Sequence, residues 1–315
     1  MNNTSSFLSC LPILLLVLNF FYSAFCFAED KAHSLSVQLD RSDDSIQIPL
    51  DYEDFPLESE TVEVTYSFQY NELTVLSVSL LKGSDDGNGA IDIEKELSGF
   101  SGTASYLKNN WSWDLGFSVN KDKSELSATL PTRVLDSNLG SSDFDADYNE
   151  EYRSTDFFVG GSYDYLWQDF IFTPSLRLGH QTSELDSFLE GTKLTSSGSF
   201  DTKEESKGGY IVPTLSVAYL WTVSDRVLWL PSFSLFWSET MWGDVVSHSF
   251  FRFSRNEVAT KSETKSTESI KSGSGLVSTS LMLVFDEFYT DLSFSQAMDT
   301  EPNSKSASLL LGLNF

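Results

Sequence analysis

SASLLLGLNF, residues 306–315, closes the chain and has the alternation of an extended strand. Successive side chains of a strand point to opposite faces. One face would carry Ala307, Leu309, Leu311, Leu313 and Phe315, and the other Ser306, Ser308, Leu310, Gly312 and Asn314. The apolar face therefore runs to the last residue, and its regular repeat predicts that this strand covers an extended apolar surface.

The same alternation of apolar and small or polar residues recurs along most of the chain. Each stretch spans about ten residues or more, longer than the ~5–6 residues of a typical soluble strand. A tilted membrane-spanning strand needs ~9–11 residues, and aromatic residues gather near its ends. The clearest stretches are TVEVTYSFQY (61–70), NWSWDLGFSVN (110–120), DFFVGGSYDYLW (156–167) and DFIFTPSLRLGHQ (169–181).

A soluble β-sandwich or a lipocalin-like barrel is the alternative to a membrane barrel. In a soluble sheet the polar face usually carries Lys, Glu and Arg. Here that face is rich in Ser, Thr, Gly and Asn, and the chain is 14% aromatic and only 40% hydrophobic. This composition excludes a bundle of membrane helices and favours an all-β transmembrane antiparallel barrel with its apolar residues facing lipid.

The connections predict the orientation of this barrel. Short turns alternate with long polar segments at 134–152, 183–207 and 241–271, as expected for short periplasmic turns and long extracellular loops. The pattern predicts about twelve strands, with ten or fourteen as alternatives. They are expected at 62–70, 73–81, 97–107, 110–119, 124–134, 153–166, 169–181, 208–222, 226–239, 272–285, 287–298 and 305–315.

Three regions are expected along the chain. Residues 1–28 are apolar and end in Cys26-Phe27-Ala28, as in a signal peptide, although a retained anchor helix is the alternative. Residues 29–60 read as an acidic extension or plug, and residues 61–315 as the barrel. Cleavage would remove both cysteines and leave the net charge of −26, which argues against nucleic acid as a partner.

A proline followed by Ser or Thr and alternating apolar residues occurs three times, in FTPSLRLG (172–179), VPTLSVAY (212–219) and LPSFSLFW (230–237). Because proline lacks an N–H, its repetition at one phase predicts a shared bulge or bend. These prolines and the final LGLNF resemble the β-domain of bacterial autotransporters, over roughly residues 62–315. The resemblance implies that Leu309, Leu311, Leu313 and Phe315 are an assembly signal for the outer-membrane barrel assembly machinery. In two departures from that family, no large passenger is expected before the barrel, and no lumen-threading helix is expected in 29–60.

The expected function is an outer-membrane pore or translocation barrel of a Gram-negative bacterium, without catalytic, cofactor-binding or metal-binding residues. Outer-membrane lipid and lipopolysaccharide are the expected partners, and the oligomeric state is left open. A structural or adhesive surface protein is the alternative, and a loop-borne hydrolase using His248 and Ser249 is a third. The charged residues expected to line the lumen are Glu63, Asp114, Glu125, Arg133, Arg153, Asp164, Asp169, Arg177 and Asp291.

Overall fold

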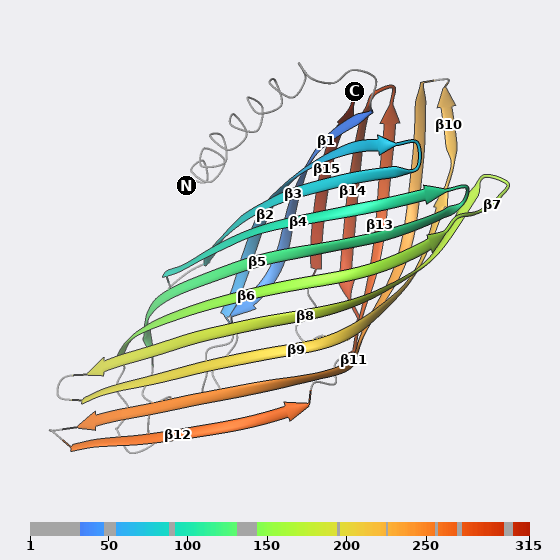
Figure 1. Ribbon diagram of the computed structural model, residues 1–315. Coiled ribbons are helices and arrows are strands. Elements are labelled where there is room, and N and C mark those ends of the chain that lie inside the picture. Colours follow the sequence, from blue (N-terminus) through green and yellow to red (C-terminus); the bar gives the residue numbers. More distant parts are fainter. Residues whose placement is uncertain are drawn as a thin grey trace, which may run out of the picture.

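The computed structural model describes residues 32–46, 55–87, 92–130, 144–193, 196–224, 226–255, 258–269, 273–298 and 305–315 (Figure 1). None of the described residues forms a helix long and apolar enough to cross a membrane. The strands are β1 (His33–Ile46), β2 (Phe55–Asn71), β3 (Thr74–Gly87), β4 (Asp92–Lys108), β5 (Trp111–Leu130), β6 (Phe144–Tyr163), β7 (Tyr165–Trp167), β8 (Phe170–Lys193), β9 (Ser196–Tyr219), β10 (Trp221–Ser224), β11 (Val227–Arg255), β12 (Val258–Ser269), β13 (Gly273–Phe285), β14 (Phe288–Ala297) and β15 (Lys305–Asn314).

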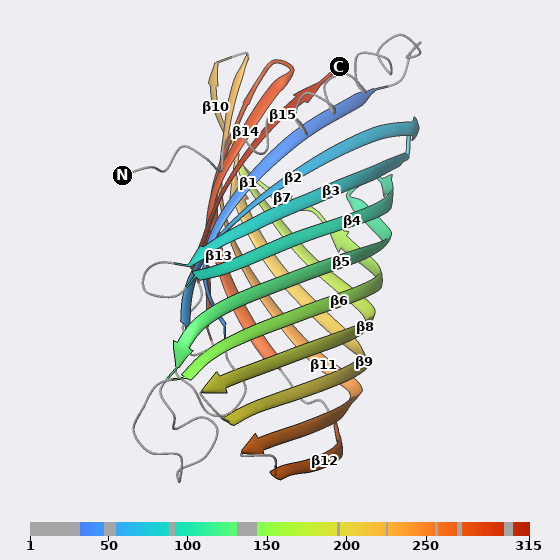
Figure 2. The same cartoon turned by 90° about the vertical axis from the view of Figure 1, so that its left-hand side faces the viewer.

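Twelve strands close into an antiparallel barrel, because the first strand pairs with the last. The ring runs from β1 through β6, then β8, β9, β11, β13, β14 and β15, and back to β1 (Figure 2). Strands β7 and β10 continue β6 and β9 after a one-residue break, and β12 pairs with the outer half of β11. Closure satisfies the backbone groups that an open sheet edge would expose to lipid, and it confirms the expected barrel.

Two strand predictions were wrong, but one missed a strand and the other added one, so the predicted number of strands was still twelve. Residues 29–60 were expected to form an extension or plug, but 33–46 form β1 in the wall, and β2 begins at Phe55. Residues 110–119 and 124–134 were expected to be two strands, but β5 passes without a turn from Trp111 to Leu130. The hydrophobic alternation stops near Asn120 because the strand leaves the membrane there, and its outer face then becomes polar as well.

The outer and inner faces of the wall differ as a membrane barrel requires. Large apolar side chains stand exposed on the outer face: Leu115 is 65% exposed and Phe157 is 58% exposed. The inner face instead carries hydroxyls that bond across strands, such as Ser112 to Ser162 at 2.7 Å. An apolar outer surface of this extent is stable only in contact with lipid.

Two aromatic bands mark the limits of the apolar surface. The periplasmic band includes Trp111, Tyr163, Phe170 and Tyr219. The extracellular band includes Phe117, Phe157, His180 and Trp242, which lie in one row of the sheet, with Gly209 between His180 and Trp242. From Phe170 to His180 there are ten residue steps on β8, about 33 Å along the strand and about 25 Å along the membrane normal at ~40° tilt. This height matches the apolar band of an outer-membrane barrel.

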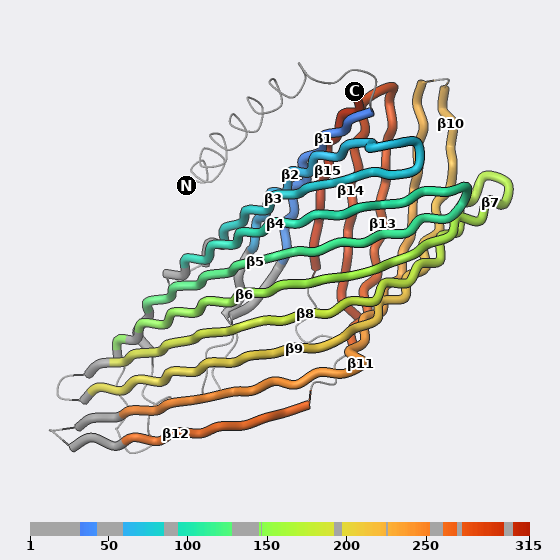
Figure 3. Tube along the Cα trace, in the orientation of Figure 1, coloured from blue at the N-terminus to red at the C-terminus, as the bar shows by residue number. Residues whose placement is uncertain are grey.

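On one side of the barrel the strands continue well beyond the extracellular band (Figures 1 and 3). The segments expected to be loops are therefore largely strands. Strand β6 begins at Phe144, β8 extends to Lys193 and β9 begins at Ser196. Strands β11 and β12 occupy 227–255 and 258–269. Outside the membrane both faces of a strand can be polar, so periodicity no longer separates strand from loop. We call this part, at the end of the barrel opposite the C terminus, the extracellular extension.

The periplasmic turns at Gln168 and Asp286 agree with the prediction, whereas the short turn expected at 120–123 lies within β5. Two-residue connections join β3 to β2, β5 to β4, β8 to β7 and β14 to β13. Asn109, Gln168 and Asp286 adopt positive φ angles of 56°, 55° and 50° in three of these turns. Positive φ is required in the tight turns that match the twist of paired strands, and it is tolerated by Asn and Asp.

The repeated prolines do not produce the expected bulge. Pro174, Pro213 and Pro231 lie at outward-facing positions, as predicted. The pairing register with the neighbouring strands is the same before and after each proline. The pairing of β9 with β11 simply omits Pro213 and its neighbour Val212, because proline has no N–H to donate. The register shift of β11 lies instead between Thr240 and Trp242.

Candidate functional site

The inner face of the barrel is lined by paired hydroxyls. Neighbouring strands place Ser or Thr directly opposite each other, and their oxygens lie within hydrogen-bond distance. Examples are Thr65 with Ser79 at 2.7 Å, Ser67 with Ser77 at 2.8 Å, Ser216 with Ser234 at 2.7 Å and Ser232 with Ser280 at 2.9 Å. This lining is polar without being strongly charged, and it provides the background for the few ionisable groups.

Four of the charged residues predicted to line the lumen lie on the inner face. Glu63 and Asp114 accept hydrogen bonds from Thr65 at 3.5 Å and Ser105 at 2.6 Å. Arg177 places its guanidinium 4.2 Å from the centre of the Phe158 ring. Asp291 lies between inward-facing Met282 and Leu310, and its Oδ1 is buried without a hydrogen-bond partner.

The other five predicted residues do not line the lumen wall. Glu125 and Arg153 lie on the outer face, where they pair with Lys123 and Glu151. Glu125 was assigned to the lumen because 124–134 was treated as a separate strand. The assignment of Arg153 was wrong because it shares the outward alternation of Phe157 and Val159 on the same strand. Asp164 and Asp169 lie at the periplasmic turn, where Thr173 donates to Asp164 at 2.6 Å. Arg133 is outside the described residues.

An aromatic ring lies flat across a glycine at the extracellular part of the lumen. Tyr210 of β9 crosses Gly179 of β8 and donates its hydroxyl to Asp156 of β6 at 2.7 Å. A Cβ on Gly179 would lie 2.1 Å from the Tyr210 ring, so only glycine permits this contact. Phe158 covers Gly116 in the same way, and Arg177 stacks on its free face. These rings tie β5, β6, β8 and β9 together and fix the position of Asp156 and Arg177.

The inner face is most tightly packed in the extracellular extension. Leu126, Tyr148 and Leu189 follow one another along one row and are only 1–2% exposed, the lowest values among the large side chains described. The adjacent row contains Glu150, to which the Tyr148 hydroxyl donates a hydrogen bond. Burial raises the pKa of both groups, which favours a protonated phenol and a less readily ionised carboxyl. A row of packed apolar and aromatic side chains therefore covers the inner face of β5, β6 and β8 at the extracellular end.

A mostly buried ion pair lies just below this row. Lys95 Nζ and Asp122 Oδ2 are 3.1 Å apart, with side chains only 15% and 22% exposed. Neither this pair nor Glu150 was predicted, because 120–123 was expected to be a turn and 134–152 a loop. Asp156 was not predicted either, although it has the inward position of the expected strand 153–166. The strict continuation of even-numbered polar residues from Ser112 to Ser124 was the available signal.

The hydrolase hypothesis fails on geometry. His248 and Ser249 are adjacent residues of strand β11 and point to opposite faces. On the outer face, His248 Nε2 lies 2.7 Å from Glu263. On the inner face, the Ser249 hydroxyl lies 3.2 Å from that of Thr202. Serine and histidine therefore cannot act together as nucleophile and base, which need to be within hydrogen-bond reach.

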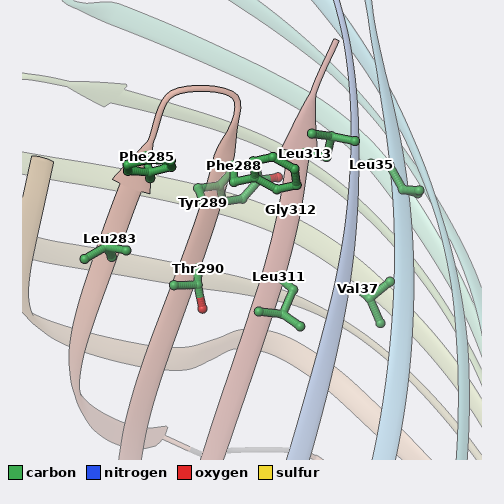
Figure 4. A pocket seen from close by; sticks show the side chains of 10 residues that line it. All are labelled: Leu35, Val37, Leu283, Phe285, Phe288, Tyr289, Thr290, Leu311, Gly312 and Leu313. Carbon is green, nitrogen blue, oxygen red and sulfur yellow. The ribbon is translucent and has the colours of Figure 1, made fainter. Parts of the chain in front are cut away.

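The C-terminal strand forms the seam of the barrel. Leu309, Leu311 and Leu313 face outward between β14 and β1, and Leu311 and Leu313 line an apolar groove of about 410 Å³ (Figure 4). At the periplasmic rim, the backbones of His33 and Phe315 exchange two hydrogen bonds of 2.8 Å. The two rings also stack with centres 5.8 Å apart. The proposed assembly signal is thus the same surface that completes the ring.

No family model matches the sequence, and no curated protein matches it. The architecture is nevertheless shared with solved structures. The translocator domain of the autotransporter NalP from Neisseria meningitidis superimposes with a TM-score of 0.58 at 11% identity, over 98% of this chain and 98% of that one. The β-domain of the Bordetella autotransporter BrkA gives a TM-score of 0.54 at 10% identity, over 91% of this chain and all of the other.

The chain has the fold of an autotransporter translocator barrel. The resemblance stated from the prolines and the final LGLNF is therefore confirmed at the level of fold. The Pseudomonas putida toluene transporter TodX matches more distantly, with a TM-score of 0.44 at 10% identity over 91% of this chain and 89% of that one, which carries no argument. The translocator-type fold and the lipid-facing surface identify an outer-membrane barrel.

Proposed function

We propose that this protein is a non-enzymatic pore or translocation barrel whose lumen prefers cations. The observation that carries the proposal is the charge of the inner face. Within the described membrane-spanning segments, the inward acidic side chains are Asp40, Glu63, Asp114, Asp156 and Asp291, and the inward basic side chain is Arg177.

These carboxylates are held in place by donors rather than neutralised by cations. Asp114 accepts from Ser105, Asp156 accepts from Tyr210, and Asp40 accepts from Gln38 at 2.9 Å. Hydroxyl and amide donors leave the negative charge of the carboxylate intact. A polar lumen with this excess of acid creates a negative potential that concentrates cations and repels anions.

The width of a twelve-strand barrel supports a conducting path. Eight strands enclose an interior that side chains just fill, and the diameter grows with strand number. Here Tyr210 and Phe158 lie flat against the wall, across Gly179 and Gly116, instead of extending toward the axis.

Planar-bilayer recordings test this function. The mature chain, inserted in a bilayer under a KCl gradient, should conduct with a reversal potential that shows a preference for K⁺ over Cl⁻. Asp114→Asn and Asp156→Asn should each move the reversal potential toward zero. Glu125→Gln is the matched control, since it removes the same charge from the outer face. Absence of conductance, or equal shifts in all three variants, would contradict the proposal.

An adhesive role is the second candidate, and the extracellular extension favours it. Strands β11 and β12 form a paired arm beyond the membrane, with Lys261, Glu263 and Lys265 exposed on it. A rigid, charged arm is suited to surface contacts. Replacing 245–269 by a short turn should abolish binding of cells to each other or to a surface, if this role holds, while leaving conductance in place.

A further inference from the structure

A groove of about 550 Å³ lies on the outer face of the wall, across β6, β8, β9, β11 and β12. These strands are neighbours in the sheet (Figure 2). The groove therefore crosses adjacent strands. Its lower edge adjoins the extracellular aromatic band, one row above Phe157, His180 and Trp242. The groove is thus at the depth where the hydrocarbon of the outer leaflet meets its headgroups.

The lining residues of the groove are mostly polar and carry charges of both signs, and Val119 of β5 and Val246 of β11 are its apolar members. The row next to the aromatic band contributes Thr155, Thr182, Lys207 and Asp244. The following row contributes Arg153, Glu184 and Glu205. Arg153 and Lys207 therefore flank the strand that carries Thr182, and their side chains can converge over its hydroxyl.

We propose that this groove binds the phosphorylated headgroup of an outer-leaflet glycolipid. A phosphate above Thr182 would receive charge-assisted hydrogen bonds from Arg153 and Lys207 and a neutral one from the threonine hydroxyl. Among the described residues, Glu184, Glu205 and Asp244 do not form a metal site of their own. Each carboxylate would instead add an oxygen ligand to a divalent cation that such phosphates already bind.

The outward direction of the groove decides the class of ligand. Its wall faces away from the lumen and sits above an apolar band, so the groups opposite it in a membrane are lipid headgroups. A uniformly basic groove would suit a free anion, whereas the mixed signs match a layer in which phosphates alternate with divalent cations. The inference is independent of whether the lumen conducts.

Arg153 is available for this contact despite its present partner. It pairs with Glu151, which also lies 3.1 Å from Lys121. These contacts lower the pKa of Glu151, chiefly through Lys121 and then Arg153, so this carboxylate stays charged. Because Glu151 keeps Lys121 and the pair is solvent-exposed, turning Arg153 toward a phosphate costs little.

Native mass spectrometry of the mature chain in detergent provides the test, with lipid A bearing two phosphates as the probe. Dephosphorylated lipid A and inorganic phosphate are the comparison ligands. We expect the phosphorylated lipid to bind at least tenfold more tightly than either comparison ligand. We also expect Mg²⁺ to strengthen its binding to the native chain, but not to a variant combining Glu205→Gln and Asp244→Asn.

Arg153→Gln combined with Lys207→Gln should weaken binding of the phosphorylated lipid about tenfold. Lys203→Gln is the matched control, because Lys203 faces outward on β9 two rows beyond Lys207 and does not line the groove. Each variant is first shown to be folded by heat-modifiable gel mobility. Equal binding of lipid A with and without phosphate, an unaffected double variant, or inorganic phosphate binding as tightly as the lipid would overturn the assignment.

Discussion

Substituting alanine for Gly179 tests the arrangement that fixes the charged wall of the lumen. Tyr210 reaches Asp156 only because its ring passes over the bare backbone of Gly179. A Cβ at that position would lie 2.1 Å from the Tyr210 Cζ and 2.3 Å from its hydroxyl oxygen. These distances are below any tolerated contact, so the ring must move and release the carboxylate.

The cost of Gly179→Ala follows from the interactions that the displaced ring would break. The bond from Tyr210 to Asp156 is charge-assisted, and breaking it costs about 1.5–3 kcal/mol. Displacing the ring against packed neighbours costs about 1–3 kcal/mol. Replacing glycine by alanine restores about 0.4–1 kcal/mol through the unfolded chain. The free energy of unfolding should therefore fall by about 1.5–5.5 kcal/mol.

Gly160→Ala is the matched control, since Gly160 also faces inward but a Cβ there would have its nearest neighbour at 3.5 Å. Its effect should stay within about 1 kcal/mol. Urea titration in detergent, followed by heat-modifiable mobility, measures both variants. Repeating Gly179→Ala in a Tyr210→Ala background should remove most of its cost. An equal loss of stability at both glycines, or an undiminished loss in that background, would refute the reasoning.

Phe315→Ala should reduce the amount of heat-modifiable barrel in outer-membrane fractions, whereas Phe315→Tyr should not, because a ring is kept at the seam. Burial raises the pKa of Glu150 above its usual 4.5, so the folded chain binds the proton more tightly than the unfolded one. The unfolding free energy should therefore fall as pH rises from about 4.5 to the raised value, and Glu150→Gln should flatten that slope in pH-dependent urea titrations. Lys95→Met leaves Asp122 without its cation and should destabilise the barrel by about 2 kcal/mol in the same titrations, less than a fully buried pair. Lys123→Met, at a solvent-exposed pair, should leave the free energy of unfolding almost unchanged.

Within the membrane, the sequence alone was sufficient to predict the main features of the barrel. Period-two alternation, as in 110–119 and 305–315, marked the lipid face correctly, because hydrocarbon demands an apolar residue at every second position. It also placed Glu63, Asp114, Arg177 and Asp291 on the inner face. Alternate residues of a strand face opposite sides, so once the outward residues are known the inward ones follow. The two-residue turns at Gln168 and Asp286 were equally clear.

Beyond the membrane the same reasoning failed for a physical reason. Water accepts polar residues on both faces, so 120–130, 144–152 and 183–207 lost their alternation while remaining largely strands. The sequence also did not predict that 33–46 form a strand of the barrel wall. This strand pairs with β15 at the other end of the chain, and no local sequence pattern indicates such a pairing.

The primary structure by itself determined that this chain forms a lipid-facing antiparallel barrel, because the solvent imposes its periodicity residue by residue. Only the tertiary structure decided which strand closes the ring, how far the wall rises above the membrane, and which side chains meet. The contact of Tyr210 with Asp156, the pair of Lys95 and Asp122 and the groove beside Arg153 and Lys207 all depend on the register between strands. Register is set by closure of the whole sheet, and it brings together residues that are far apart in sequence.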